Sequence, residues 1–198
     1  MVCVIGVHVT TGTGAGAASR GSPRRASAHL VDNMGTCRLV DAALASGTTE
    51  QFVLVSALLT NAPAMGQAMN GSYLALEALG NVLSEKHEAE LYLRSRASKN
   101  GDMAYTIVRP GALASKGGLV DDAALADRGL GVRLGAEDTL FELRPRLAVP
   151  RAAVAALCVE ALGDARSRGR LVEMVGEEGM LPLEQVGNPW AVAEAAVA

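Results

Sequence analysis

Tyr105-Thr-Ile-Val-Arg-Pro-Gly111 is the stretch that indicates the fold class of this chain. Its first four residues are aromatic or β-branched, which is typical of a strand, and we interpret them as a buried parallel strand. Arg109-Pro110-Gly111 then closes the strand, because proline and glycine favour a turn. Further strands are predicted at Val2–Ile5, Phe52–Val55 and Leu171–Val175.

Segments with helical periodicity separate these strands. Helices are predicted from Asp32 or Asn33, either of which can cap the first turn, to about Ala45, from Tyr73 to Ser98, and from Pro150 to Leu162. Glu90 and Arg94 are expected to pair four residues apart on the long helix. Residues 112–135 are predicted to form a loop with at most a short helix. The alternation of strands and helices favours a doubly wound α/β fold, with a parallel sheet covered on both faces.

Ligands of such sheets bind beyond the carboxyl ends of the strands. The residues that directly follow predicted strands are Gly6, Ser56 and the group Arg109, Pro110 and Gly111. We therefore expect the binding site to be built from these positions.

Composition limits the classes of protein that remain. The chain has 198 residues, a net charge of −3 and 49% hydrophobic residues, which is typical of one globular domain without a basic nucleic-acid surface. Three widely spaced cysteines exclude a disulfide framework and a Cys-x-x-Cys zinc site. The sequence contains no serine-hydrolase elbow, no His-Glu-x-x-His motif and no G-x-x-x-x-G-K-[ST] phosphate loop, and we expect no metal site.

Residues 7–30 allow two interpretations. The absence of acidic residues before Asp32, together with several arginines, resembles an organelle transit peptide. Alternatively, the segment is a low-complexity loop or insertion after a first strand. Gly12-Thr-Gly-Ala-Gly-Ala17 fits the G-x-G-x-x-A pattern of a dinucleotide-binding turn, but Gly21 and Pro23 interrupt the helix that must follow it. The loop interpretation is therefore favoured over a phosphate-binding turn.

Several segments in order resemble the short-chain dehydrogenase/reductase superfamily, in its atypical NmrA-like branch. These segments are Asn33-Met-Gly-Thr36, Phe52–Ser56, Tyr105–Gly111 and Val149–Ala155. The strings Val31-Asp-Asn33, Asn61–Gln67, Glu85–Glu90 and Glu137–Leu140 resemble plant and algal plastid members of that branch, which are associated with plastoglobules.

This resemblance implies a Rossmann-like domain that binds NAD or NADP. It implies that Ser56 lines the nicotinamide site, unless it is a simple turn serine. Lys86 occupies the position of the family lysine and would contact a ribose or phosphate, unless it is a solvated helix lysine. The catalytic tyrosine expected four residues earlier is replaced by Val82. Arg109 would contact the cofactor or support its loop, which Pro110 and Gly111 would shape.

Members of this family begin with three strands and a glycine-rich phosphate loop that find no counterpart before the strand at Val2. The resemblance therefore implies an incomplete sheet, without the first three strands and the phosphate loop. Residues 1–186 would be the C-terminal portion of one NAD(P)-binding domain, with residues 7–30 as a loop or insertion and residues 187–198 as a tail. Any transit peptide would then lie further upstream.

Two functions follow from the resemblance. The first is an NAD(P)-dependent chloroplast oxidoreductase acting on a small organic or lipid-soluble substrate, with peripheral association with a plastid membrane or plastoglobule. The second is a non-catalytic nucleotide-binding regulatory or scaffold protein, or a truncated inactive fragment, because the Tyr-x-x-x-Lys pair is absent.

Overall fold

The computed structural model describes residues 3–5, 28–101, 103–113, 130–140, 148–178 and 183–191. Its centre is a five-stranded sheet in the order β1-β2-β3-β5-β4. The bounds of the strands are Cys3–Ile5 for β1, Gln51–Val55 for β2, Ala104–Pro110 for β3, Leu130–Ala136 for β4 and Arg170–Glu178 for β5. The fold is thus α/β and Rossmann-like, as the sequence predicts. The expectation that three further strands precede this sheet stays a prediction.

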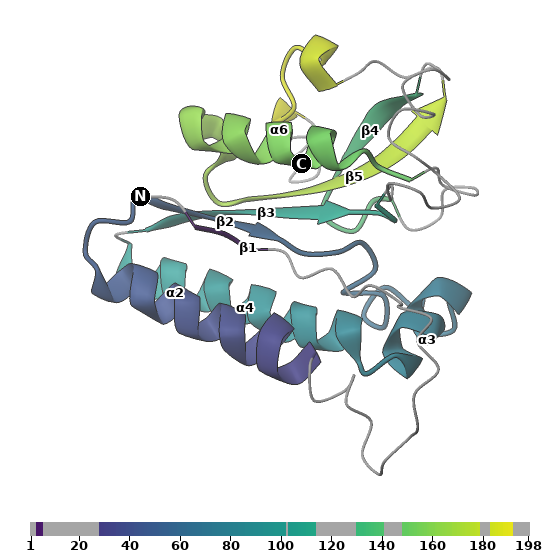
Figure 1. The fold of residues 1–198 in the computed structure, drawn as a ribbon, viewed down its shortest axis with the longest axis horizontal. Helices are drawn as coiled ribbons and strands as arrows, with labels where there is room; N and C mark the ends of the chain where they lie inside the picture. The colour runs from purple at the N-terminus through teal and green to yellow at the C-terminus, as the bar shows by residue number, and fades with distance from the viewer. Residues whose placement is uncertain are drawn as a thin grey trace, which may run out of the picture.

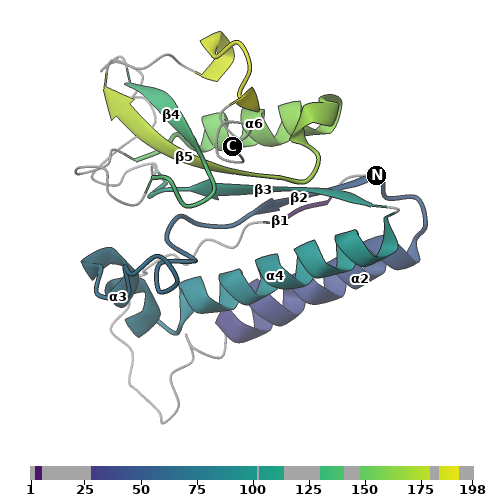
Figure 2. The same cartoon turned by 180° about the vertical axis from the view of Figure 1, so that it is seen from behind.

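Helices cover both faces of the sheet, which confirms the expected layering (Figures 1 and 2). One face carries α2 (Thr36–Ala45) and α4 (Val82–Asn100), and the other carries α6 (Arg151–Gly163). Two short 3-10 helices, η2 (Ala165–Ser167) and η3 (Leu183–Gln185), flank β5 in the sequence. The connections β1–α2–β2 and β2–α4–β3 lead to strands that pair in parallel, which explains why both helices share one face.

The strands read as continuous apolar runs because both of their faces are buried. Phe52 and Leu54 pack with Ile107 in the cluster beneath α2 and α4. Val53 and Val108 point the other way and pack against α6 in a second cluster. That second cluster also contains Trp190, the single tryptophan of the sequence, which is 0% exposed. Part of the segment that the sequence left as an unassigned tail therefore belongs to the core.

The first helix begins earlier than expected and is not capped as expected. Residues Ala28–Gly35 form the π-helix η1, which continues directly into α2. The N-cap position of α2 is Gly35, so neither Asp32 nor Asn33 caps this helix. Wide π-type turns occur frequently at functional sites, because they rotate side chains away from the regular helical positions. Here the π-helix carries Asp32 in a buried position.

The single long helix expected between Tyr73 and Ser98 is wrong. The structure has two helices, α3 (Gly71–Ala78) and α4, which begins at Val82. They are separated at Gly80 and Asn81, whose φ angles are 121° and 59°. A positive φ cannot continue a right-handed helix, and glycine and asparagine are the residues that adopt it most readily. The apolar periodicity continues through this break and therefore hid it.

A strand also lies where the sequence predicted a loop. β4 occupies Leu130–Ala136 and pairs antiparallel with β5, so the sheet is mostly rather than entirely parallel. Its glycines, Gly131 and Gly135, obscured the strand pattern, because glycine has low strand propensity. An added Cβ at Gly135 would meet the side chains of Thr139 and Leu140 at 2.6 Å, so the returning turn requires glycine there.

Candidate functional site

A small pocket lies at the carboxyl end of β2, between η1 and α4. Its lining combines two buried charges, a serine and a threonine with three apolar residues: Asp32, Thr36, Leu54, Val55, Ser56, Lys86 and Ala89. This is the edge of the sheet at which parallel α/β proteins bind their ligands. The pocket therefore lies where the sequence places the site.

An ion pair between η1 and α4 forms one wall of the pocket. Lys86 Nζ donates to Asp32 Oδ1 at 2.7 Å, and the two side chains are 10% and 2% exposed. A buried charge requires a partner of opposite sign, and each of these groups is the partner of the other. Lys86 is therefore not a solvated helix lysine, and that alternative is wrong.

Two polar atoms at the pocket, Ser56 Oγ and Asp32 Oδ2, are buried and make no hydrogen bond of standard geometry within the described part of the chain. Ser56 follows β2, and its backbone N–H donates to the carbonyl of Val108 at 2.8 Å. Its Oγ atom is buried without a hydrogen bond of standard geometry, and its hydroxyl lies near enough to Glu90 to help lower the pKa of that carboxyl. Asp32 Oδ2 is also buried and unpaired. Buried polar atoms are nearly always hydrogen-bonded, and unpaired ones at a pocket indicate a position that a ligand or water fills.

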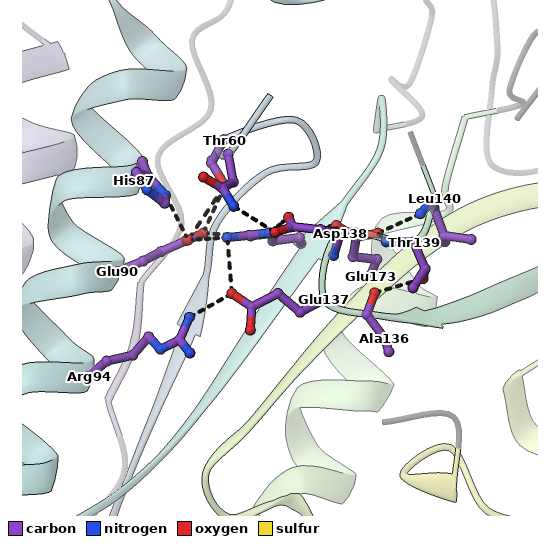
Figure 3. A network of polar contacts seen from close by, with 12 residues as sticks. Thr60, His87, Glu90, Arg94, Ala136, Glu137, Asp138, Thr139, Leu140 and Glu173 are labelled. Atoms are coloured by element: carbon purple, nitrogen blue, oxygen red, sulfur yellow. Dashed lines mark hydrogen bonds and ion pairs between the residues drawn. The ribbon is translucent and has the colours of Figure 1, made fainter. Parts of the chain in front are cut away.

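A second polar cluster is centred on Arg109, which pairs with several carboxylates. Figure 3 shows its partners Glu90, Glu137, Asp138 and Glu173. The guanidinium of Arg109 is 0% exposed and donates to both carboxylate oxygens of Glu90, at 3.0 and 2.6 Å. A further N–H donates to Asp138 Oδ1 at 2.7 Å. Such a bidentate contact between an arginine and a carboxylate is strong and directional. It ties α4 to β3 and to the turn after β4.

Glu173 completes the cluster from the neighbouring strand. It is the register partner of Arg109 across β3 and β5, and its Oε1 lies 3.6 Å from Arg109 Nη1. Its carboxylate accepts hydrogen bonds from the backbone N–H groups of Asp138, Thr139 and Leu140. Figure 3 shows this turn wrapped around the carboxylate. The cluster thus fixes the turn at 137–140, whose residue Asp138 has a φ of 60°.

Burial and ion pairing shift the pKa values of the residues in this cluster in opposite directions. Burial alone would raise the pKa of Glu90, but the contacts with His87 and Arg109 outweigh it and lower the pKa. Burial likewise acts to lower the pKa of Arg109, and its carboxylate neighbours raise it. For Glu173, burial dominates and raises the pKa. Glu90 is thus held as an anion, while Glu173 is destabilised as one.

The structure brings together two of the expected site residues, Ser56 and Lys86, in the pocket. Arg109 lies in the adjacent cluster, enclosed by protein carboxylates. Pro110 belongs to β3 itself, so the strand extends beyond its expected end. Gly111 follows it and donates its N–H to the carbonyl of Met174 at 2.8 Å. Gly6 lies outside the described residues, as does the glycine-rich segment 12–17.

The expected pairing of Glu90 with Arg94 is wrong. Glu90 binds Arg109, and Arg94 donates instead to Glu137 Oε1 at 2.6 Å (Figure 3). Periodicity along one helix identifies neighbours on that helix, but a buried cation from the adjacent sheet competes more strongly for the carboxylate.

A comparison with known families shows the family to which the chain belongs. Residues 5–165 match the family model described as NAD(P)H-binding. The chain belongs to the NAD(P)H-binding family. An Arabidopsis thaliana protein described as uncharacterized and chloroplastic is 41% identical over 145 residues, which cover 73% of this chain and 45% of that protein. The chain therefore spans about half the length of this relative.

Two residues that line the pocket, Lys86 and Ser56, are among those that the sequence assigns to a cofactor site. Lys86 offers N–H donors and Ser56 offers a hydroxyl, and both lie at the edge of the sheet where parallel α/β folds bind their ligands. NAD or NADP is thus the cofactor class of the family. Within the described residues, no group of three or more His, Cys, Asp or Glu is placed to hold a metal ion.

Residues that sequence reasoning missed carry much of this site. Asp32 was interpreted as a helix cap, although it stands beside apolar residues on a helix that packs on the sheet. Glu173 interrupts the apolar run Leu171–Val175, and a charge within a buried strand is a signal that it has a buried partner. No sequence signal marked Asp138.

Among the described residues, no helix is long and apolar enough to cross a membrane.

Proposed function

We propose that this NAD(P)H-binding family member is an oxidoreductase that acts on a small organic or lipid-soluble substrate. The observation that supports this most directly is the pocket at the end of β2, which both Lys86 and Ser56 line. Because the alignment with its plant relative covers 45% of that protein, the activity of the whole protein is part of the proposal.

Some pocket residues would hold the cofactor, and others would orient the substrate. A reduced nicotinamide supplies a hydride when bound. Lys86, fixed by Asp32, would hold the sugar next to it. Ser56 would donate its hydroxyl proton in a hydrogen bond to the oxygen of a carbonyl substrate, which stabilises charge developing on that oxygen.

The proton donor of the usual reductases has no counterpart in this pocket. Val82 stands four residues before Lys86, and all three tyrosines lie among the described residues. Tyr92 donates to Asp41, the Tyr73 hydroxyl lies 3.4 Å from Ser84 Oγ, and Tyr105 is not part of the pocket lining. This observation favours a second candidate, a protein that binds NAD(P) and senses or carries it without turnover.

Binding and turnover measurements separate these candidates. NADPH and NADH are titrated against the protein, following the fluorescence of the reduced nicotinamide, and oxidation is then measured with a panel of aldehydes, ketones and quinones. Binding with turnover supports the oxidoreductase, binding alone supports the second candidate, and no binding of either dinucleotide overturns both.

Ser56→Ala is the informative variant for the oxidoreductase. It should bind NADPH nearly as the wild type does and lose turnover by about tenfold or more, since one hydrogen bond to a developing charge is worth about 1.5–3 kcal/mol. Ser46→Ala, at an exposed serine after α2, is the matched control and should leave both quantities unchanged. Equal turnover of Ser56→Ala and wild type would exclude this role for Ser56.

We further propose a chloroplast location with peripheral contact to a lipid surface. The location rests on the description of the plant relative. The lipid contact rests on residues 57–81, where Glu77 is the single charged residue and its carboxylate binds Leu83 and Ser84. In this segment Met65, Met69, Leu74 and Leu76 are exposed, with Met69 83% exposed.

Flotation with vesicles of neutral galactolipid tests this contact. Met69→Glu should reduce the bound fraction by about tenfold, because burial of a methionine side chain is worth about 1.5 kcal/mol or more. Leu91→Glu, at an exposed leucine on α4, is the control and should bind as the wild type does. No flotation of the wild type, or equal flotation of Met69→Glu, would contradict the proposal.

A further inference from the structure

We propose that Asp32 is itself a ligand-binding residue of the pocket. One of its carboxylate oxygens fixes Lys86, and the other accepts a hydrogen bond from a ligand hydroxyl. This inference rests on the proposed function, because the ligand is taken to be a sugar hydroxyl of a nicotinamide dinucleotide.

The first argument is that only one of the two carboxylate oxygens of Asp32 has a hydrogen-bond partner. Oδ1 receives Lys86 Nζ at 2.7 Å, whereas Oδ2 is buried and has no partner. The side chain is 2% exposed, so bulk water does not compensate for the missing bond. An unsatisfied buried polar atom costs about 1–3 kcal/mol, and more when it is charged, which makes a ligand or a bound water the natural partner.

The second argument is that the side-chain amide of the adjacent residue, Asn33, already has hydrogen-bond partners. Asn33, the next residue, donates its Nδ2 to Glu85 Oε2 at 2.8 Å and accepts from Cys37 Sγ with its Oδ1. It therefore does not rotate towards Asp32 without breaking both contacts. Among the described residues no donor reaches Asp32 Oδ2, and we assign that place to a molecule that enters the pocket.

The chemical character of that molecule follows from the groups that meet it. An ionised carboxylate only accepts hydrogen bonds, an ammonium only donates them, and a serine hydroxyl does both. A hydroxyl or a pair of neighbouring hydroxyls, as in a ribose, satisfies both the carboxylate of Asp32 and the ammonium of Lys86. A phosphate does not, because it offers no proton to Asp32 Oδ2 and is repelled by its charge. Asp32 Oδ2 thus favours a hydroxyl over a phosphate as the group that it contacts.

Calorimetric titration with NADPH tests this assignment. Asp32→Asn should weaken binding about tenfold or more, since a hydrogen bond to a charged group is worth about 1.5–3 kcal/mol. Asp41→Asn is the matched control, because Asp41 also joins the first helical segment to α4, through Tyr92 and Arg96, but does not line the pocket. It should bind NADPH as the wild type does.

A ligand variant locates the contact. An NADPH analogue that lacks both hydroxyls on its nicotinamide ribose should bind wild type and Asp32→Asn with equal affinity, because the contact is then absent from both complexes. ADP should also bind both proteins equally, since it lacks that ribose. If Asp32→Asn fails to fold, the pair Asp32→Asn with Lys86→Gln replaces it, because both buried charges are then removed together.

The outcomes distinguish this inference from the function on which it rests. If the wild type binds NADPH and Asp32→Asn binds it equally well, the role of Asp32 is overturned and the proposed function stands. If Asp32→Asn weakens NADPH and its dideoxy analogue to the same degree, the hydroxyl contact is also overturned. If the wild type binds neither NADPH nor NADH, the proposed function fails, and this inference fails with it.

Discussion

Replacing Arg109 by methionine removes the cation around which the buried cluster is built. The change keeps most of the volume of the side chain but leaves Glu90 and Glu173 buried without it, at 1% and 0% exposure. Breaking a buried ion pair on one side costs about 3–5 kcal/mol. For a chain of this size, each kcal/mol lowers the melting temperature by about 2–4 °C, so we expect a decrease of about 6–20 °C.

The same variant should also change how stability depends on pH. In the wild type the pKa of Glu90 lies below its ordinary value of 4.5, so its contribution is fully present above pH 4.5 and is lost as the pH falls through the lowered pKa. Without Arg109, burial raises the pKa above 4.5 instead. The variant then loses stability as the pH rises, and the difference from the wild type should widen from pH 5 to pH 8.

Urea denaturation, followed by the fluorescence of the fully buried Trp190, measures both effects. Arg133→Met is the control, since Arg133 and its partner Glu177 are each 39% exposed and such pairs contribute about 1 kcal/mol or less. Combining Arg109→Met with Glu90→Gln should recover about 1–3 kcal/mol, because the uncompensated charge is removed. A loss below about 1 kcal/mol for Arg109→Met, or a difference that narrows towards pH 8, would refute this reasoning.

Three further substitutions test separate parts of the structure. Gly135→Ala places a Cβ 2.6 Å from side-chain atoms of Thr139 and Leu140 and should lower the free energy of unfolding by about 1–3 kcal/mol, measured by urea denaturation; a neutral effect would contradict the turn geometry. Asn70→Ala removes the side chain that caps α3 and should cost about 1 kcal/mol, whereas Asn70→Ser should cost less. Glu173→Gln removes a carboxyl whose pKa is raised by burial, so the decline of stability above pH 4.5 that this group causes should disappear. An unchanged pH profile would show that Glu173 is not destabilised as an anion.

Local sequence determined the strands and most of the helices. A strand buried on both faces is mostly apolar and rich in β-branched and aromatic residues, so Phe52–Val55 and Tyr105–Val108 could be recognised without any knowledge of their neighbours. Strand ends also share one edge of a parallel sheet, which placed Ser56 at the ligand-binding edge. The sequence did not predict the helix break at Gly80 or the edge strand β4. Apolar periodicity persists across the break, and glycines weaken the strand pattern.

Tertiary structure alone decided which charges meet. Lys86 lies 54 positions from Asp32, and Arg109 lies 19 positions from Glu90 and 29 from Asp138. The sequence shows that these residues are charged, but an ion pair depends on distance in space, and only the packing of η1, α4 and the sheet brings the groups within 3 Å. Sequence therefore determined the layers and the edge of the sheet where a ligand binds, while the fold chose Asp32 as the partner of Lys86 and enclosed Arg109 among carboxylates.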